Sequence, residues 1–181
     1  MSDAETLFDT LAALQADKRL PPVGQWHPEH EGRIDIRIAA DGTWYHDGDP
    51  IRRSGMVKIF SSVLRKDPDG YCLVTPAEKL LIEVEDAPFV AVDFEAKGSG
   101  QGGDLIFVTN VEDYVVVDDG HELRVEDLDG QPRPYVHVRD GLDALINRAV
   151  FYRLVDLGIQ EGSEYCVYSR GARFSLGRTD S

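Results

Sequence analysis

The chain has 181 residues, of which 42% are hydrophobic, so it can bury the core of one domain or of two small ones. Its formal net charge of −14 at pH 7 argues against nucleic acids and anionic membrane surfaces as partners. No apolar run approaches the roughly 20 residues that cross a bilayer, and the acidic N-terminus does not resemble a secretory signal, so we expect a cytoplasmic protein.

The first predicted element is an amphipathic helix over residues 4–16. Its apolar side chains recur at helical spacing, at Leu7, Phe8, Leu11 and Leu14. A proline-rich loop follows at residues 20–24 and ends the helix. We therefore assign residues 1–25 to an N-terminal helix and linker.

A first α+β unit is predicted over residues 26–96. Alternating apolar residues and turn signals predict strands at 34–38, 43–46, 71–75, 79–83 and 89–94. Between the second and third strands, an apolar face at 3.6-residue spacing predicts a helix from Ser54, as N-cap, to about Lys66. The expected unit is an antiparallel sheet with one helix.

A glycine-rich link at 97–103 separates this unit from a second one at 104–181. The second unit is predicted to hold strands at 105–109, 114–117, 121–125, 164–169 and 172–176, and residues 135–138 lead into its helix. Its helix is placed at 142–157, with Asp140 as N-cap and Gly158 after its end.

Short patterns in the first unit return in the second and indicate an internal duplication. The run that begins at Tyr71-Cys72 returns at Tyr165-Cys166, and Arg53-x-Gly55 returns as Arg139-x-Gly141 before the second predicted helix. The fold class is therefore α+β, with two related units that each contain an antiparallel sheet and one helix.

Longer motifs resemble the bacterial family known as domain of unknown function 1285. They are Asp41-Gly42-x-Trp44, Gly48-x-Pro50-Ile51, Leu73-Val74-Thr75-Pro76 and Val84-Glu85-Asp86-Ala87-Pro88-Phe89, followed by Thr109-Asn110. The resemblance implies a duplicated-domain architecture whose C-terminal half is similar to a pleckstrin-homology fold. It also implies a ligand pocket at the domain interface, for a nucleotide-like molecule, and a signalling role. It supplies no catalytic residues.

One motif fits a known phosphate-binding pattern but has the wrong surroundings. Residues 98–103 match G-x-G-x-x-G, yet a predicted strand follows where the dinucleotide fingerprint requires a helix. A flexible hairpin or linker is the favoured interpretation. No sequence pattern predicts a bound metal, a cofactor or a catalytic residue.

Charge and helix starts point to an anion site. Residues 131–178 contain seven Arg and five acids, against an excess of 16 negative charges elsewhere. A helix N-terminus attracts anions, and a preceding Arg adds donors. The candidate ligand-binding residues are Arg53, Ser54, Arg139 and Arg148, with Trp44 to stack on a base. The alternatives are Arg residues paired with nearby acids, and a Trp44 that fills the core.

The leading function hypothesis is a non-enzymatic sensory or binding protein that holds a small anionic, nucleotide-like ligand between its two units. The first alternative is a protein–protein adaptor, and the second is a hydrolase that acts on a phosphorylated small molecule. The sequence leaves a homo-oligomer open.

Overall fold

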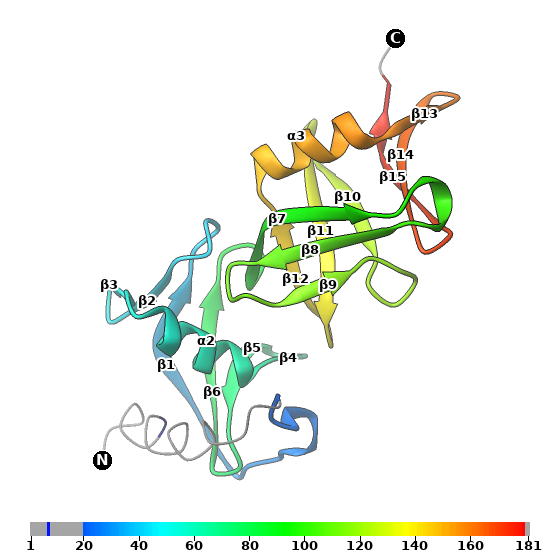
Figure 1. Cartoon of the computed structure of the whole chain (residues 1–181). Coiled ribbons are helices and arrows are strands. Elements are labelled where there is room, and N and C mark those ends of the chain that lie inside the picture. Colours follow the sequence, from blue (N-terminus) through cyan, green and yellow to red (C-terminus); the bar gives the residue numbers. More distant parts are fainter. Residues whose placement is uncertain (1–6, 8–19, 180–181) are drawn as a thin grey trace. The chain divides into compact units, whose positions relative to one another are not determined.

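The computed structural model divides the chain into unit 1, Met1–Asp86, and unit 2, Ala87–Ser181. It describes Leu7 and residues 20–179. Apart from Leu7, the N-terminal helix predicted at 4–16 lies outside the described residues. The two units are described in turn below (Figure 1).

Unit 1 is built on a six-stranded sheet within its described part. In chain order its elements are η1 (Val23–Gln25), β1 (His30–Ile38), β2 (Trp44–His46), β3 (Asp49–Pro50), α2 (Ser54–Ser62), β4 (Leu64–Asp67), β5 (Gly70–Val74) and β6 (Glu78–Val84). The strand order is β3-β2-β1-β6-β5-β4, and β1 pairs with β6 in parallel. The sheet is therefore mixed, whereas the short turns between the predicted strands indicated an antiparallel one.

The described part of unit 2 contains a six-stranded sheet, a helix and a three-stranded sheet. The elements are β7 (Phe89–Lys97), η2 (Gly100–Gly102), β8 (Asp104–Thr109), β9 (Tyr114–Val116), β10 (Leu123–Leu128), β11 (Gln131–Arg139), β12 (Leu142–Ile146), α3 (Arg148–Leu157), β13 (Ile159–Glu161), β14 (Glu164–Ser169) and β15 (Ala172–Arg178). The larger sheet has the order β10-β11-β12-β7-β8-β9, with β7 and β12 parallel.

The two large sheets share one topology. In each, a three-stranded meander (β1-β2-β3 or β7-β8-β9) lies beside a second meander (β4-β5-β6 or β10-β11-β12), and the first and last strands pair in parallel at the centre. This supports the predicted duplication but changes its residue correspondence. Cys72 lies in β5, whose counterpart is β11, whereas Cys166 lies in β14 of the additional three-stranded sheet. The Tyr-Cys match is therefore not a structural equivalence.

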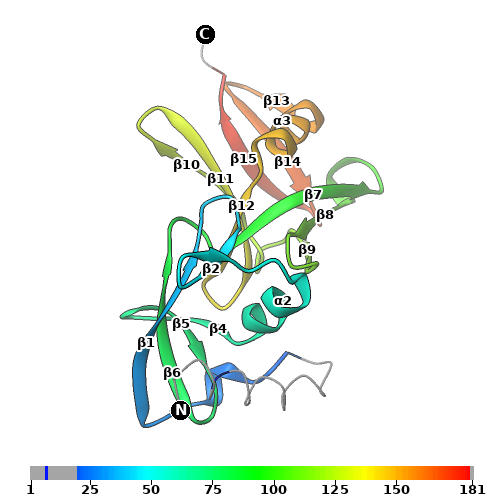
Figure 2. The same cartoon turned by 90° about the vertical axis from the view of Figure 1, so that its left-hand side faces the viewer.

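The helices also occupy different places in the two units. Helix α2 connects the third and fourth strands of its sheet, whereas α3 follows the sixth strand. Figure 2 shows α2 between β2 and β4 of unit 1. Helix α2 ends at Ser62, earlier than the predicted Lys66, and the hydroxyls of Ser61 and Ser62 donate to the carbonyls of Lys58 and Ile59 in its last turns. The next residues form β4, which pairs with β5.

The second predicted helix is half wrong. Residues 142–146 form β12, in which alternate side chains are buried, and the helix begins only at Arg148. Asp140 is not an N-cap, because Asp140 and Gly141 have φ values of 46° and 79° and join β11 to β12 in a tight turn. The N-cap is Asn147, whose Oδ1 accepts a hydrogen bond from the backbone N–H of Ala149 at 3.0 Å.

The glycine-rich run predicted to link the units lies inside unit 2. The division falls at Asp86, and β7 pairs with both β12 and β8. Residues 98–103 therefore connect β7 to β8 within one hairpin. Among the described residues, no helix is long and apolar enough to cross a membrane.

Candidate functional site

A cavity of about 280 Å³ lies within unit 2, where the tip of the β7–β8 hairpin approaches the end of α3 and strand β14. The hairpin contributes residues 96–105 except Gly102, and the other wall contains Leu157, Ile159 and residues 166–168. Figure 1 shows the hairpin extending toward β14 and β15. Ligand pockets typically measure about 300–1,000 Å³, so this cavity lies just below that range and has room for only a small molecule.

The three pattern glycines of G-x-G-x-x-G shape this hairpin tip. Gly98 and Gly100 have φ values of 79° and 65°, in the region that L side chains rarely adopt. A Cβ on Gly103 would lie 2.9 Å from the carbonyl oxygen of Lys97. The pattern therefore has a conformational cause, and the favoured hairpin interpretation accounts for it.

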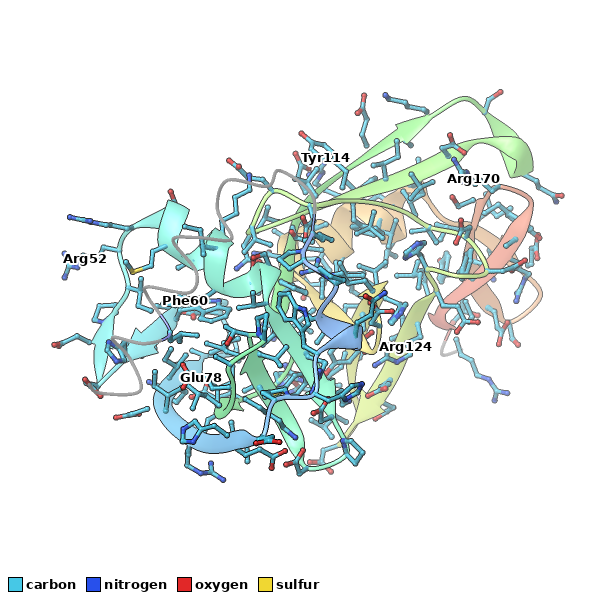
Figure 3. The ribbon with its side chains drawn as sticks, turned by 90° about the horizontal axis from the view of Figure 1, so that it is seen from below. Arg52, Phe60, Glu78, Tyr114, Arg124 and Arg170 are labelled. Atoms are coloured by element: carbon cyan, nitrogen blue, oxygen red, sulfur yellow. The ribbon has the colours of Figure 1, made fainter. Side chains whose placement is uncertain are left out.

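The β14–β15 turn holds the hairpin tip in place. The backbone N–H groups of Arg170 and Gly171 donate to the carbonyl oxygens of Gly103 and Gln101, each at 2.9 Å. Arg170 Nε also donates to Asp104 Oδ1 at 3.2 Å. Figure 3 shows Arg170 beside the hairpin. The tip is thus fixed by backbone and side-chain bonds.

The side-chain walls of the cavity are mainly apolar. Leu105 and Val167 are 2% and 5% exposed and form its inner surface beside Cys166. Leu157 and Ile159 also line it but are about half exposed, at 50% and 49%. Burial raises the pKa of the Cys166 thiol, so this group is a neutral part of the wall at neutral pH.

A charged network borders the cavity at Tyr168. Its hydroxyl donates to Glu161 Oε1 at 2.6 Å, and Arg173 Nε donates to Glu161 Oε2 at 2.9 Å. The hydrogen bond from Tyr168, with that from Arg173, lowers the pKa of Glu161. The same bond raises the pKa of Tyr168, since its proton is held by the carboxylate. The Tyr168 hydroxyl proton and this Glu161 oxygen are thus engaged in the bond between them.

Among the residues that line the cavity, Lys97 is the one with a basic side chain. It faces Asp104 across the β7–β8 pairing, but Asp104 binds Arg170 instead. Among the described residues, no carboxylate lies within 4.0 Å of the Lys97 ammonium. Lys97 is therefore an exposed lining residue whose ammonium forms no ion pair within the described part of the chain.

A second polar cluster lies on the β10–β12 face of unit 2. His137 Nδ1 donates to Asp143 Oδ1 at 3.0 Å, and His121 Nδ1 donates to the carbonyl oxygen of His137 at 3.2 Å. Since these oxygens accept, each neutral ring keeps its lone pair on Nε2. Arg124 binds the other oxygen of Asp143 at 2.9 Å. The His137–Asp143 pair has the form of an oriented general base.

The candidates from unit 1 have different surroundings. Arg53 and Ser54 are exposed at the start of α2, with Arg53 rather than Ser54 at the N-cap. Trp44 is only 1% exposed and stacks on Phe60, with ring centroids 6.1 Å apart. Figure 3 shows Phe60 directed into unit 1. The expectation that Trp44 stacks on a ligand is therefore wrong, because the ring is enclosed in the core.

The two candidates from unit 2 lie on different elements. Arg139 ends β11 and does not precede a helix. Its guanidinium donates to Asp113 Oδ2 at 2.8 Å and lies over the ring of Phe89, as the pairing alternative supposed. Arg148 is the exposed first residue of α3. None of the five predicted residues lines the cavity.

Sequence reasoning missed the cavity itself. Residues 97–103 were recognised as a glycine-rich turn, and strand 164–169 was predicted, but the approach of one to the other is a tertiary contact. The bond from the Leu105 N–H to Ser169 Oγ joins residues 64 positions apart. The available signal was the predicted strand directly after the glycine pattern. It indicates that residues 98–103 form the tip of a hairpin, and a hairpin tip must pack against another part of the fold.

Two family models cover most of the chain. The model described as domain of unknown function (DUF1285), N-terminal domain, matches residues 21–87. The model described as protein of unknown function (DUF1285), C-terminal domain, matches residues 88–176. Their junction agrees with the division between the units. No curated protein matches the chain.

Two crystal structures resemble the chain. A DUF1285 family protein from Silicibacter pomeroyi DSS-3 is 47% identical, with a TM-score of 0.85 over 93% of this chain and 94% of that one. A DUF1285 family protein from Shewanella baltica OS155 is 29% identical, with a TM-score of 0.53 over 67% of this chain and 90% of that one.

Proposed function

The chain belongs to the DUF1285 family, and on that premise we propose that it binds a small molecule in the cavity of unit 2. The observation that carries the proposal is a partly open, mainly apolar space that is lined in part by the half-exposed Leu157 and Ile159. Large apolar side chains at the entrance are covered when a ligand binds, which removes their surface from water.

The chemistry of the lining favours binding over catalysis. Asp104 is paired with Arg170, Tyr168 with Glu161, and the Cys166 thiol is buried with a raised pKa. A catalytic acid, base or nucleophile needs a proton or lone pair directed at the substrate. The cavity is therefore proposed as a recognition site, and a sensory role would follow if occupancy changed how the protein interacts with a partner.

The more detailed expectations from the sequence stay predictions. They are the nucleotide-like ligand between the units, the signalling role, the bacterial and cytoplasmic setting, the homo-oligomer, and the pleckstrin-like character of unit 2. Unit 2 does have a sheet followed by one helix, as a pleckstrin-homology domain would, but three further strands follow α3.

Mapping by NMR tests the proposal. We expect titration with neutral fragments such as indole and octanol to shift the amide signals of residues 96–105 and 157–168. Ala96→Phe should abolish these shifts, because Ala96 lines the cavity and pairs with Leu105 across the hairpin. Val92→Phe, at another exposed position of β7, is the control. Shifts that are absent, or equally strong in Ala96→Phe, would exclude this cavity as the site.

The His137–Asp143 pair supports hydrolysis as a second candidate function. Its Nε2 could accept a proton from water during attack on a phosphate ester, in line with the hydrolase alternative. Release of p-nitrophenol from p-nitrophenyl phosphate, and its loss in His137→Gln, would support this function. Turnover that is absent, or unchanged in the variant, would exclude the pair from such a reaction.

A further inference from the structure

The charges around the cavity of unit 2 restrict the kind of ligand that it can hold, an inference that rests on the proposed function. Asp104 lines the space, and Glu161 accepts a hydrogen bond from the hydroxyl of Tyr168, which also lines it. Each of these carboxylates is engaged by an arginine, Arg170 or Arg173. Each arginine is shared with a second carboxylate, Asp118 or Glu164, so the two clusters carry more negative than positive charge. Lys97 adds one positive charge that no described carboxylate approaches within 4.0 Å.

One uncompensated cation suits one negative charge. A phosphorylated or nucleotide ligand brings two or more charges, and the bordering carboxylates of Asp104 and Glu161 would repel the excess. One backbone donor of the hairpin tip is already engaged. Its Gly103 N–H donates to the carbonyl of Gly100, and the carbonyls of Gln101 and Gly103 are bound by the β14–β15 turn.

The rest of the cavity requires an apolar ligand body. Leu105 and Val167 are buried in the inner wall, and the half-exposed Leu157 and Ile159 form its open side. A hydrocarbon or aromatic group that enters would contact the inner pair and cover the outer pair. A polar ligand body would lose hydrogen bonds to water without replacement on these walls.

We propose that the ligand is a small amphipathic monoanion, with an apolar body between the β7–β8 hairpin tip and β14 and a carboxylate-like group at Lys97. A medium-chain carboxylate has this chemistry. A nucleoside monophosphate does not, since it carries a larger charge and a polar sugar.

Calorimetric titration of the full chain with three probes tests the ligand class. The probes are octanoate, the neutral octanol of equal chain length, and adenosine monophosphate. We expect octanoate to bind most tightly and its affinity to fall as salt rises. Octanol should bind more weakly, since it lacks the charge, and adenosine monophosphate should bind weakest.

Lys97→Met should reduce octanoate affinity by about two- to fivefold, the range for one exposed ion pair, and leave octanol affinity unchanged. Lys97→Arg should restore octanoate binding. Lys66→Met removes the same charge from unit 1 and should have no effect. Octanol binding as tight as octanoate, tighter adenosine monophosphate binding, or no effect of Lys97→Met would overturn the inference while leaving the cavity a binding site. Failure of every probe to bind would overturn the proposed function as well.

Discussion

Arg65 donates two parallel hydrogen bonds to Asp67, from Nε to Oδ1 at 2.7 Å and from one terminal nitrogen to Oδ2 at 2.8 Å. Lys79 Nζ lies 2.8 Å from the same Oδ2. Arg65 also donates from its other terminal nitrogen to the carbonyl oxygens of Val23 and Trp26, each at 2.8 Å. One guanidinium thus ties β4 to the chain before β1, and Asp67 keeps it oriented.

The ion pairs of Asp67 with Arg65 and Lys79 predict that the fold loses stability in acid. The hydrogen bond from Arg65, with the ion pair to Lys79, lowers the pKa of Asp67 from 3.8 to about 2. A carboxylate with a lowered native pKa stabilises the fold above pH 4, and that contribution disappears as the pH falls toward 2. We expect it to be about 1–2 kcal/mol at pH 7, after allowance for solvent screening.

Urea unfolding of the wild type and Asp67→Asn at pH 7 and pH 2.5 measures this contribution. The difference in free energy of unfolding between the two proteins should be large at pH 7 and should shrink at pH 2.5. Asp119→Asn, at an exposed loop position, should stay within about 0.5 kcal/mol of the wild type. A difference that is the same at both pH values would show that Asp67 acts without its charge.

The hairpin tip predicts unequal responses at neighbouring glycines. Gly103→Ala places a Cβ 2.9 Å from the Lys97 carbonyl oxygen, so the backbone must shift, at a cost of about 1–3 kcal/mol. Gly102→Ala meets open space and should change stability by less than about 0.5 kcal/mol. Thermal unfolding of both variants compares them directly. Equal shifts in Tm would contradict the close approach at Gly103.

Local sequence signals predicted most strands because one face of each is buried. Ile36 and Ile38 alternate with polar residues and are 2% and 0% exposed in β1. The same reasoning was ambiguous at residues 142–157. The run Leu142, Leu145, Ile146 fits a helix, whereas Leu142, Ala144, Ile146 fits the strand that forms. The Asp140-Gly141 turn decides between them, since it demands positive φ at two successive residues.

The duplication was predictable in outline but not in register. Strands that share one buried face draw on the same few residue types, so Tyr71-Cys72 and Tyr165-Cys166 look alike without being equivalent. Only the pairing of β1 with β6 and of β7 with β12 reveals the repeat. The cavity has the same limitation, because a hairpin tip and a strand distant in sequence meet through bonds such as that from the Arg170 N–H to the Gly103 carbonyl.

The core of unit 1 predicts a large cost for loss of one aromatic ring. Phe60 is 1% exposed and its ring stacks on Trp44, with an interplanar angle of 13°. Phe60→Ala should lower the free energy of unfolding by about 3–5 kcal/mol through lost burial and a residual cavity. Phe60→Leu refills most of the volume and should cost clearly less. Urea unfolding followed by circular dichroism measures the loss of unfolding free energy in both variants. Equal losses would show that the volume of the side chain at this position does not determine stability.

The two cysteines should resist thiol reagents while the protein is folded. Cys72 and Cys166 are both free thiols and are 0% exposed. Burial raises the pKa of Cys72 from 9.0 to about 11, so little reactive thiolate forms at pH 8. Labelling with an aromatic disulfide at pH 8 should be slow in buffer and fast in 8 M urea. Rapid labelling of the folded chain would show that at least one of the two thiols is accessible to the reagent.

The start of α3 gives a prediction that separates the observed helix from the one expected at Leu142. Asn147 Oδ1 accepts a hydrogen bond from the Ala149 N–H, which would otherwise lack a partner in the first turn. Asn147→Ala should cost about 1 kcal/mol, the typical value for loss of an N-cap. Asn147→Asp keeps the acceptor and adds a negative charge at the positive end of the helix, so it should preserve stability.

Asp140→Gly should also be tolerated, because glycine suits the φ of 46° at that turn position. Thermal unfolding of the three variants distinguishes the two helix starts, since an N-cap at Asp140 would leave Asn147→Ala close to the wild type.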